Sequence, residues 1–231
     1  RKEVFSEKEK GEAIGVFQAY SDVEEGDIVT NQIAALRREH DYSYSDFAIL
    51  YRTNAQSRIF EEALRKRGMP YKIYGGLSFY QRKEIKDVIA YFRLSINPND
   101  DEALRRIINY PARGIGETTL KKLHTLASTE NKSIWETINT CDLKNAGLNS
   151  GTISKLNAFR ELIQTFINDN ESGSDAYELG QLIYNRTGIL TLLAHDSTPE
   201  SISRQENLQE ILSGLKDFVD IREQTGEGEA D

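Results

Sequence analysis

The sequence has very few sulfur-containing residues and few histidines, which limits the chemistry open to it. Cys141 is the single cysteine and Met69 the single methionine. One cysteine excludes a disulfide within the chain and a metal site built from several cysteines, and it fits a reducing cytoplasm. The three histidines, His40, His124 and His195, lie far apart in the sequence, so we expect no metal site.

Long apolar runs and a starting methionine are also missing. No stretch approaches the roughly 20 apolar residues that a bilayer-spanning helix needs, and no signal peptide follows Arg1. We therefore expect a cytoplasmic protein with no membrane partner. Because the chain begins with Arg1 and residues 224–231 are polar and glycine-rich, we interpret it as a piece of a longer protein.

A further absence concerns catalysis. The chain has no Gly-x-x-x-x-Gly-Lys-[Ser/Thr] loop, the phosphate cradle of many ATPases, and no constellation of a nucleophile and a base. The sequence therefore predicts no catalytic residues and no cofactor bound by this chain alone. We expect no ATP hydrolysis from it.

Charge is unevenly distributed along the chain. The net charge is −8, yet residues 52–122 carry 15 basic against 8 acidic residues, while the remainder carries 14 basic and 29 acidic residues. A local basic region can bind phosphate groups whatever the overall charge. Charge alone favours a plainer interpretation, in which these arginines and lysines lie on solvated helix faces.

The pattern of apolar residues predicts two kinds of structure. Apolar runs at 14–20, 46–51 and 71–74 indicate strands, and they alternate with helices that begin at Asp22 and cover 55–67. This alternation predicts an incomplete parallel α/β sheet over residues 1–79. Residues 80–231 are predicted to be all-helical, with helices at 83–95, 101–109, 117–128, 133–139, 151–168, 175–187 and 201–222. No internal repeat is apparent.

The first candidate site is the run Tyr51-Arg-Thr-Asn-Ala-Gln-Ser-Arg58, which joins a predicted strand to a predicted helix. Ligands of open α/β sheets bind at this edge. Arg52 can reach a phosphate and Asn54 can hydrogen-bond a base or sugar, with Thr53 and Arg58 beside them. The alternative is that Thr53 or Asn54 only caps the helix and that Arg52 is only a surface charge.

The second candidate site joins the two predicted parts of the chain. Its paired glycines permit unusual backbone angles, its two aromatic residues could stack on a base or anchor a core, and its cations could touch phosphates or pair within the helix. These junction residues are Gly75, Gly76, Phe79, Tyr80, Arg82 and Lys83.

The third candidate site lies in residues 107–123, where a helix ends at a proline-containing turn and Gly114-Ile115-Gly116 leads into the next helix. Backbone N–H groups at the start of a helix attract anions, and Ile115 is expected to point inward. This pattern resembles a helix-hairpin-helix element, which binds the duplex DNA backbone without reading sequence. The alternative is a plain helical turn. The candidate duplex-binding residues are Arg113, Gly114, Ile115, Gly116, Thr118, Thr119, Lys121 and Lys122.

Taken together, these strings resemble the superfamily 1 DNA helicases of the UvrD/PcrA/Rep type. The resemblance rests on Phe47–Arg58, Tyr71–Gly76, Glu84–Asp87, Asn97–Asp101 and Arg113–Gly116, in that order, with Ser203–Glu210 similar to a later family segment. It implies that residues 1–79 are part of the RecA-like domain 2A and that residues 80–231 are most of the helical domain 2B.

The resemblance also implies a function. The parent protein is expected to translocate 3′ to 5′ on DNA with ATP and Mg²⁺, using motifs that lie outside this sequence. This chain is expected to contact single-stranded DNA through 51–58 and duplex DNA through 114–116, with the remaining helicase domains as its other partners. Two alternatives stay open: a standalone helical DNA-binding adaptor, and the equivalent region of a helicase-nuclease.

Overall fold

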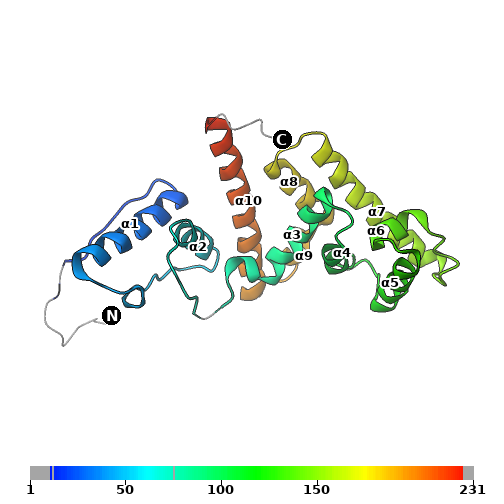
Figure 1. The fold of residues 1–231 in the computed structure, drawn as a ribbon, viewed down its shortest axis with the longest axis horizontal. Coiled ribbons are helices and arrows are strands. Elements are labelled where there is room, and N and C mark those ends of the chain that lie inside the picture. The colour runs from blue at the N-terminus through cyan, green and yellow to red at the C-terminus, as the bar shows by residue number, and fades with distance from the viewer. Residues whose placement is uncertain (1–10, 12, 75, 226–231) are drawn as a thin grey trace. The chain divides into compact units, whose positions relative to one another are not determined.

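The computed structural model describes residues 11, 13–74 and 76–225, and the regular elements among them are all helices (Figure 1). The chain divides into two compact units. The first unit contains residues up to Leu50 together with Ile59–Lys72, and the second contains Tyr51–Arg58 together with the residues from Ile73 onward.

The first unit is built on two helices, α1 (Asp22–His40) and most of α2 (Ser57–Lys66), with a short 3-10 turn, η1 (Tyr44–Asp46). The Ser21 side chain caps α1 by accepting a hydrogen bond from the Glu24 N–H. Acidic residues in the first turn and basic residues in the last turn complement the helix dipole. A small core gathers Ile33, Leu64 and Met69.

The predicted sheet is wrong for the part of the chain that the structure describes. None of its residues lies in a strand, and the runs 14–20, 46–51 and 71–74 are without regular structure except for the end of η1. A strand needs a neighbour to satisfy its N–H and C=O groups, and these three runs do not pair with one another. Their side chains show the consequence, because Ile14, Val16 and Leu50 are 92%, 91% and 89% exposed.

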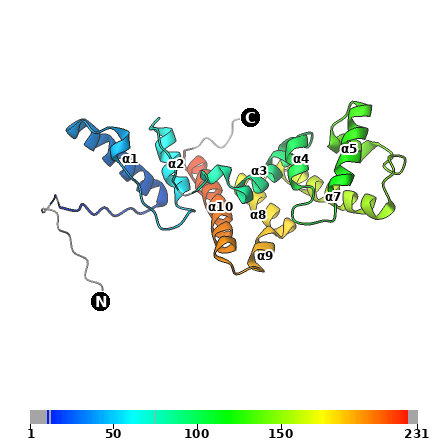
Figure 2. The same cartoon turned by 90° about the horizontal axis from the view of Figure 1, so that it is seen from below.

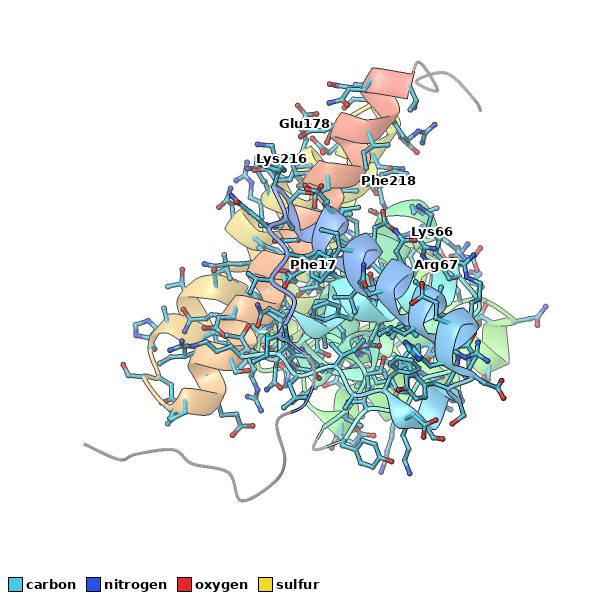
Figure 3. All side chains as sticks on the ribbon, turned by 90° about the vertical axis from the view of Figure 1, so that its left-hand side faces the viewer. Phe17, Lys66, Arg67, Glu178, Lys216 and Phe218 are labelled. Carbon is cyan, nitrogen blue, oxygen red and sulfur yellow. The ribbon has the colours of Figure 1, made fainter. Side chains whose placement is uncertain are left out.

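Phe17, labelled in Figure 3, belongs to the same extended run before α1 and is 60% exposed. These residues carry the apolar pattern of a buried strand, but in the described chain they stay mostly exposed. The spacing of apolar residues predicts which side chains are suited to burial, but it does not predict which other segment buries them.

The second unit is a helical assembly, as the sequence predicts. Its elements are η2 (Phe79–Gln81), α3 (Lys83–Ile96), α4 (Asp101–Ile107), α5 (Glu117–Glu130), α6 (Ile134–Thr140), α7 (Ser150–Glu171), α8 (Ala176–Thr187), α9 (Ile189–Ala194) and α10 (Pro199–Thr225). All seven predicted helices are confirmed, and α9 is an addition. Side-chain caps from Asp100, Ser133, Asn149 and Asp175 start four of them.

Helix α3 is the centre of the second unit, because it packs against α4, α7, α8 and α10. Its inward residues Ile85, Val88, Tyr91 and Leu94 have no exposed surface. Helices α4 to α7 lie together at one end of this unit, while α8 and α9 lie along α10 (Figures 1 and 2). The long helices among the described residues are all too polar to span a bilayer.

Candidate nucleic-acid interface

The turn that precedes α2 is held by its own glutamine. The Gln56 Oε1 atom accepts hydrogen bonds from the N–H groups of Arg52 at 2.9 Å and Thr53 at 3.0 Å. Gln56 therefore fixes the backbone of the turn that leads into α2. This leaves the side chains of Arg52 and Asn54 exposed on a turn of fixed shape.

Arg52 is the most available cation of this turn. Its guanidinium makes no hydrogen bond or ion pair with any residue in the described ranges, and its side chain is exposed. The Asn54 amide lies 3.5 Å from the Ser203 hydroxyl, at the outer limit of a hydrogen bond. Thr53 is half-buried. Arg52 and Asn54 thus keep the freedom to meet a ligand.

Arg82 joins this turn to the helices of the second unit. Its Nη1 atom donates to the Asn54 carbonyl oxygen at 2.9 Å and to Asn207 Oδ1 at 2.8 Å, and its Nη2 atom donates to the Ser57 hydroxyl at 2.9 Å. The Asn207 amide then donates to Glu84 Oε1 at 2.6 Å. Ser57, Glu84 and Asn207 are buried. We call the five residues linked by these hydrogen bonds the Arg82 network: Asn54, Ser57, Arg82, Glu84 and Asn207.

Arg58 points away from solvent. Its side chain is 6% exposed, and its Nε atom donates to Glu210 Oε1 of α10 at 2.9 Å. A buried arginine that pairs with a carboxylate holds structure together and is poorly placed to meet a ligand. The structure therefore brings Arg52, Thr53 and Asn54 together at the surface and separates Arg58 from them.

The junction residues have different surroundings. Phe79 is fully buried, 5.3 Å from the Tyr80 ring in an edge-to-face pair, so it anchors the core. Tyr80 is half-buried, Lys83 is exposed above the Tyr110 ring, and Gly76 is exposed. Gly75 lies outside the described residues.

An ion pair between a buried carboxylate and a partly exposed arginine links α3 to α4 near the junction. The Arg106 Nε atom donates to Asp87 Oδ1 at 2.7 Å, and the Asp87 side chain is 4% exposed. Burial raises the pKa of the Asp87 carboxyl above its usual value, although Arg106 and Lys83 act in the opposite direction. Asp87 thus holds α3 to α4, the first helix of the α4–α5 hairpin.

The loop between α4 and α5 is organised by Asn109. Its Oδ1 atom accepts from the N–H groups of Arg113 at 2.9 Å and Ile115 at 3.1 Å. The Arg113 side chain turns back into the protein, where it donates to the Ile107 carbonyl oxygen at 2.9 Å and to the Tyr91 hydroxyl at 2.7 Å. Arg113 therefore supports the loop from behind.

The three central residues of this loop differ in what they require. Ile115 is 1% exposed, which confirms that it points inward. Gly114 has a φ of +69°, a conformation that other residues adopt at a cost. Gly116 has a φ of −86°, and a side-chain carbon added there would meet only open space, so neither its backbone angle nor its surroundings require glycine. The conformational requirement belongs to Gly114.

Gly116 is also the N-cap residue of α5, and no side chain caps that helix. In the described chain, the N–H groups of Glu117 and Thr118 have no protein acceptor, and Thr118 and Lys121 are exposed while Thr119 is half-buried. Lys122 is engaged elsewhere, because its Nζ atom donates to the Gly147 carbonyl oxygen at 2.6 Å. The loop thus leaves free N–H groups and one unpaired lysine at the surface.

Sequence reasoning missed the residues that hold these two sites in place. Gln56, Asn109 and Asn207 act through amide side chains, which are common on any surface and carry no distinctive spacing. One signal was available: Ser203, Asn207 and Glu210 recur every three or four residues, so they share one face of a helix. The described residues contain no cluster of three His, Cys, Asp or Glu side chains that could hold a metal ion.

Comparison with known proteins places the chain in a family. Residues 1–229 match the model of the UvrD-like helicase C-terminal domain. An ATP-dependent DNA helicase PcrA from Leuconostoc citreum is 39% identical over 219 residues, which is 95% of this chain and 29% of that protein. A protein of the same name from Bacillus subtilis (strain 168) is 38% identical over 217 residues, 94% of this chain and 29% of the relative.

A third relative, the PcrA helicase of Staphylococcus aureus (strain Mu50), is 38% identical over 208 residues, covering 90% of this chain. The chain thus spans less than a third of the length of these relatives, 28% in the Staphylococcus aureus protein. The family match covers residues 1–229 and therefore includes all three candidate sites. The chain belongs to the UvrD-like helicase C-terminal domain family.

Proposed function

We propose that this chain supplies DNA contacts to an ATP-dependent DNA helicase that moves 3′ to 5′. The observation that carries the proposal is the Arg82 network, which brings the separate segments 51–58, 82–84 and 207 to one place and leaves Arg52 exposed there. Relatives that align with almost the whole of this chain, at 38% and 39% identity, are named ATP-dependent DNA helicases.

In this proposal the turn at 51–58 contacts single-stranded DNA. Arg52 supplies a guanidinium for a phosphate, and Asn54 supplies an amide for a base or sugar. Both side chains stand on a turn whose backbone is fixed by Gln56 and Arg82. A fixed backbone lowers the entropy lost when the turn binds DNA. Arg58 contributes by pairing with Glu210 and not by contacting DNA.

Duplex DNA is proposed to meet the α4–α5 hairpin. The exposed N–H groups of Glu117 and Thr118, the left-handed Gly114 and the charge of Lys121 suit a phosphate backbone. Arg113 and Ile115 support this loop from inside the protein. Contacts of this kind are independent of DNA sequence and weaken steeply with salt.

The ATP-hydrolysing part is proposed to lie in the remainder of a longer protein, with ATP and Mg²⁺ as its cofactors. The exposed apolar residues Ile14, Val16 and Leu50 are suited to contact with that remainder. The same residues count against a standalone adaptor, which would expose them to water. We place the boundary between the 2A part and the helical 2B part at Phe79–Tyr80.

Replacement of Arg52 by alanine tests the single-strand contact. We expect the purified chain to lose about tenfold in affinity for a fluorescent oligo-dT strand, about 1.4 kcal/mol, with a salt slope lower by about 0.7. Arg105→Ala is the matched control, because Arg105 is exposed on α4 and has no partner in the described residues. Equal affinities for the two variants in fluorescence anisotropy would remove the 51–58 turn from the DNA track.

A further inference from the structure

The second unit contains an internal repeat that the sequence alone did not reveal. Residues 113–123 and 146–156 align without a gap, and both pass from a loop into a long helix, α5 or α7. Gly114 and Gly147 occupy the same place, with φ of +69° and +73°. The next residue is a buried aliphatic in both, Ile115 or Leu148, 1% and 7% exposed.

The correspondence continues into the helices. Gly116 and Asn149 are the two N-cap residues, with φ, ψ of −86°, 172° and −77°, 161°. Seven residues further on, Leu123 and Leu156 are both fully buried. The chemistry of the two copies differs at most other positions, which is why the repeat is inconspicuous in the sequence.

One lysine of each copy donates a hydrogen bond to the backbone of the other copy, and we call these the crossing lysines. Lys122 and Lys155 hold equivalent positions. The Lys122 Nζ atom donates to the Gly147 carbonyl oxygen at 2.6 Å, and the Lys155 Nζ atom donates to the Gly114 carbonyl oxygen at 3.3 Å. When residue i contacts residue j and the equivalents contact in return, the two copies are related by an approximate two-fold axis.

The glycines accommodate these lysines as well as the left-handed backbone. A side-chain carbon at position 114 would lie 2.6 Å from Lys155 Nζ, and one at position 147 would lie 3.5 Å from Lys122 Nζ. Contact below 3.0 Å forces a neighbour to move, so any residue but glycine at 114 displaces the lysine from its carbonyl. Gly114 and Lys155 therefore form a matched pair, whereas the 3.5 Å at position 147 is an ordinary contact, and there the left-handed backbone alone favours glycine.

We propose that Lys122 and Lys155 are positioning residues, which fix the spacing of the α4–α5 and α6–α7 loops and thereby set the surface offered to duplex DNA. Two loops related by a two-fold axis suit a duplex, whose two strands are themselves related by two-fold axes. The ammonium groups act through the opposite loop's carbonyl and are not the phosphate ligands. This inference rests on the proposed duplex contact.

The test uses Lys122→Met and Lys155→Met, which keep the length of the side chain and remove the donor. Lys121→Met is the matched control for the exchange readout alone, because Lys121 is the exposed neighbour of Lys122 and makes no side-chain hydrogen bond or ion pair within the described residues. In the affinity readout Lys121→Met shows instead what the loss of a proposed phosphate contact looks like. Lys122→Arg retains a donor and should restore the behaviour of the unmodified chain.

The first readout needs no DNA. Lys122→Met should speed hydrogen exchange at the Gly147 and Leu148 amides, which bond to the Lys144 and Leu143 carbonyl oxygens. Lys155→Met should do the same at the Ile115 amide, which bonds to Asn109. Lys121→Met should alter neither loop. Unchanged exchange in the opposite loop for both crossing variants overturns the proposal.

The second readout is affinity for a short DNA duplex at low and moderate salt. We expect each crossing variant to lose about fivefold or more, and the double variant to lose about as much as either single one, since both remove the same spacing. Additive losses, each with a salt slope lower by about 0.9, would make the lysines phosphate ligands and reject the proposal. If the unmodified chain bound no duplex, the proposed function would fail, while the exchange experiment would still decide the positioning role.

Discussion

The pKa values of two tyrosines in the second unit are shifted by burial more than by neighbouring charges. Tyr91 is fully buried, its hydroxyl donates to the Tyr110 carbonyl oxygen, and it accepts from Arg113 at 2.7 Å. Burial raises the pKa of Tyr91 from its ordinary value of 10.0 to about 12, although Arg113 lowers it. Burial also raises the pKa of Tyr184, whose hydroxyl donates to the Leu208 carbonyl oxygen.

These tyrosines predict a loss of stability at alkaline pH. Between pH 10 and about 12, Tyr91 ionises in the unfolded chain but keeps its proton in the folded one. The free energy of unfolding should therefore fall with rising pH in this window, by about 1.4 kcal/mol per pH unit for one tyrosine. Urea unfolding followed by circular dichroism from pH 9 to 12 measures this slope. Tyr91→Phe should make it shallower, and an unchanged slope in that variant would contradict the assignment.

The direction in which an arginine points could not be predicted from the sequence. Arg52, Arg58 and Arg113 all lie in motif strings, yet only Arg52 faces solvent without a partner in the described residues. The sequence did predict that Ile115, an aliphatic residue between two glycines, points inward. Burial of an aliphatic follows from its own chemistry, whereas the orientation of a guanidinium depends on acceptors brought from distant segments, such as Glu210 and Tyr91.

Between elements, the Arg82 network joins the turn before α2 to α3 and α10. The three hydrogen bonds of Arg82 converge on a backbone carbonyl, an amide and a hydroxyl, so a lysine cannot reproduce them. We expect Arg82→Lys to lower the free energy of unfolding by about 3 kcal/mol.

The location of the loss distinguishes this network from a general effect on the core. Hydrogen exchange in Arg82→Lys should rise at the Ser57 and Arg58 amides, which bond to the Asn54 and Ala55 carbonyl oxygens, and stay unchanged in α5. Arg93→Lys serves as the control, because Arg93 forms a surface ion pair with Asp100. A uniform rise over the whole second unit would mean that Arg82 only contributes to packing.

At this scale the sequence predicted helices well and the sheet poorly. Helices satisfy their hydrogen bonds within one segment, so caps and apolar periodicity at 83–222 are sufficient to locate them. A strand depends on a partner, and the sequence of one strand cannot say whether that partner is present. The short α9 escaped prediction because its six residues are too few to show a period.

In the molecule as a whole, two units have cores of very different size. The first gathers Ile33, Leu64 and Met69, while the second surrounds α3 with buried side chains from every helix of that unit. Stability from apolar burial scales with the area removed from water. The first unit should therefore open at a lower free energy than the second.

Native-state hydrogen exchange in increasing urea tests this difference. Amides of α1 should lose protection in a separate transition below that of α3 and α7, which should open only with global unfolding. Ile33→Ala should shift the first transition alone, and Leu94→Ala the second. A single transition shared by α1 and α3 in the unmodified chain would show that the two units unfold together.

The crossing of Lys122 and Lys155 also bears on how the two hairpins can change over evolutionary time. Positions of a repeat that make no contact with the other copy can change independently. Here the backbone of each copy accepts a hydrogen bond from a lysine of the other, and a side chain at Gly114 would displace Lys155. Selection must therefore treat Gly114 and Lys155 as one inherited unit, while exposed positions that make no contact between the copies remain free to diverge.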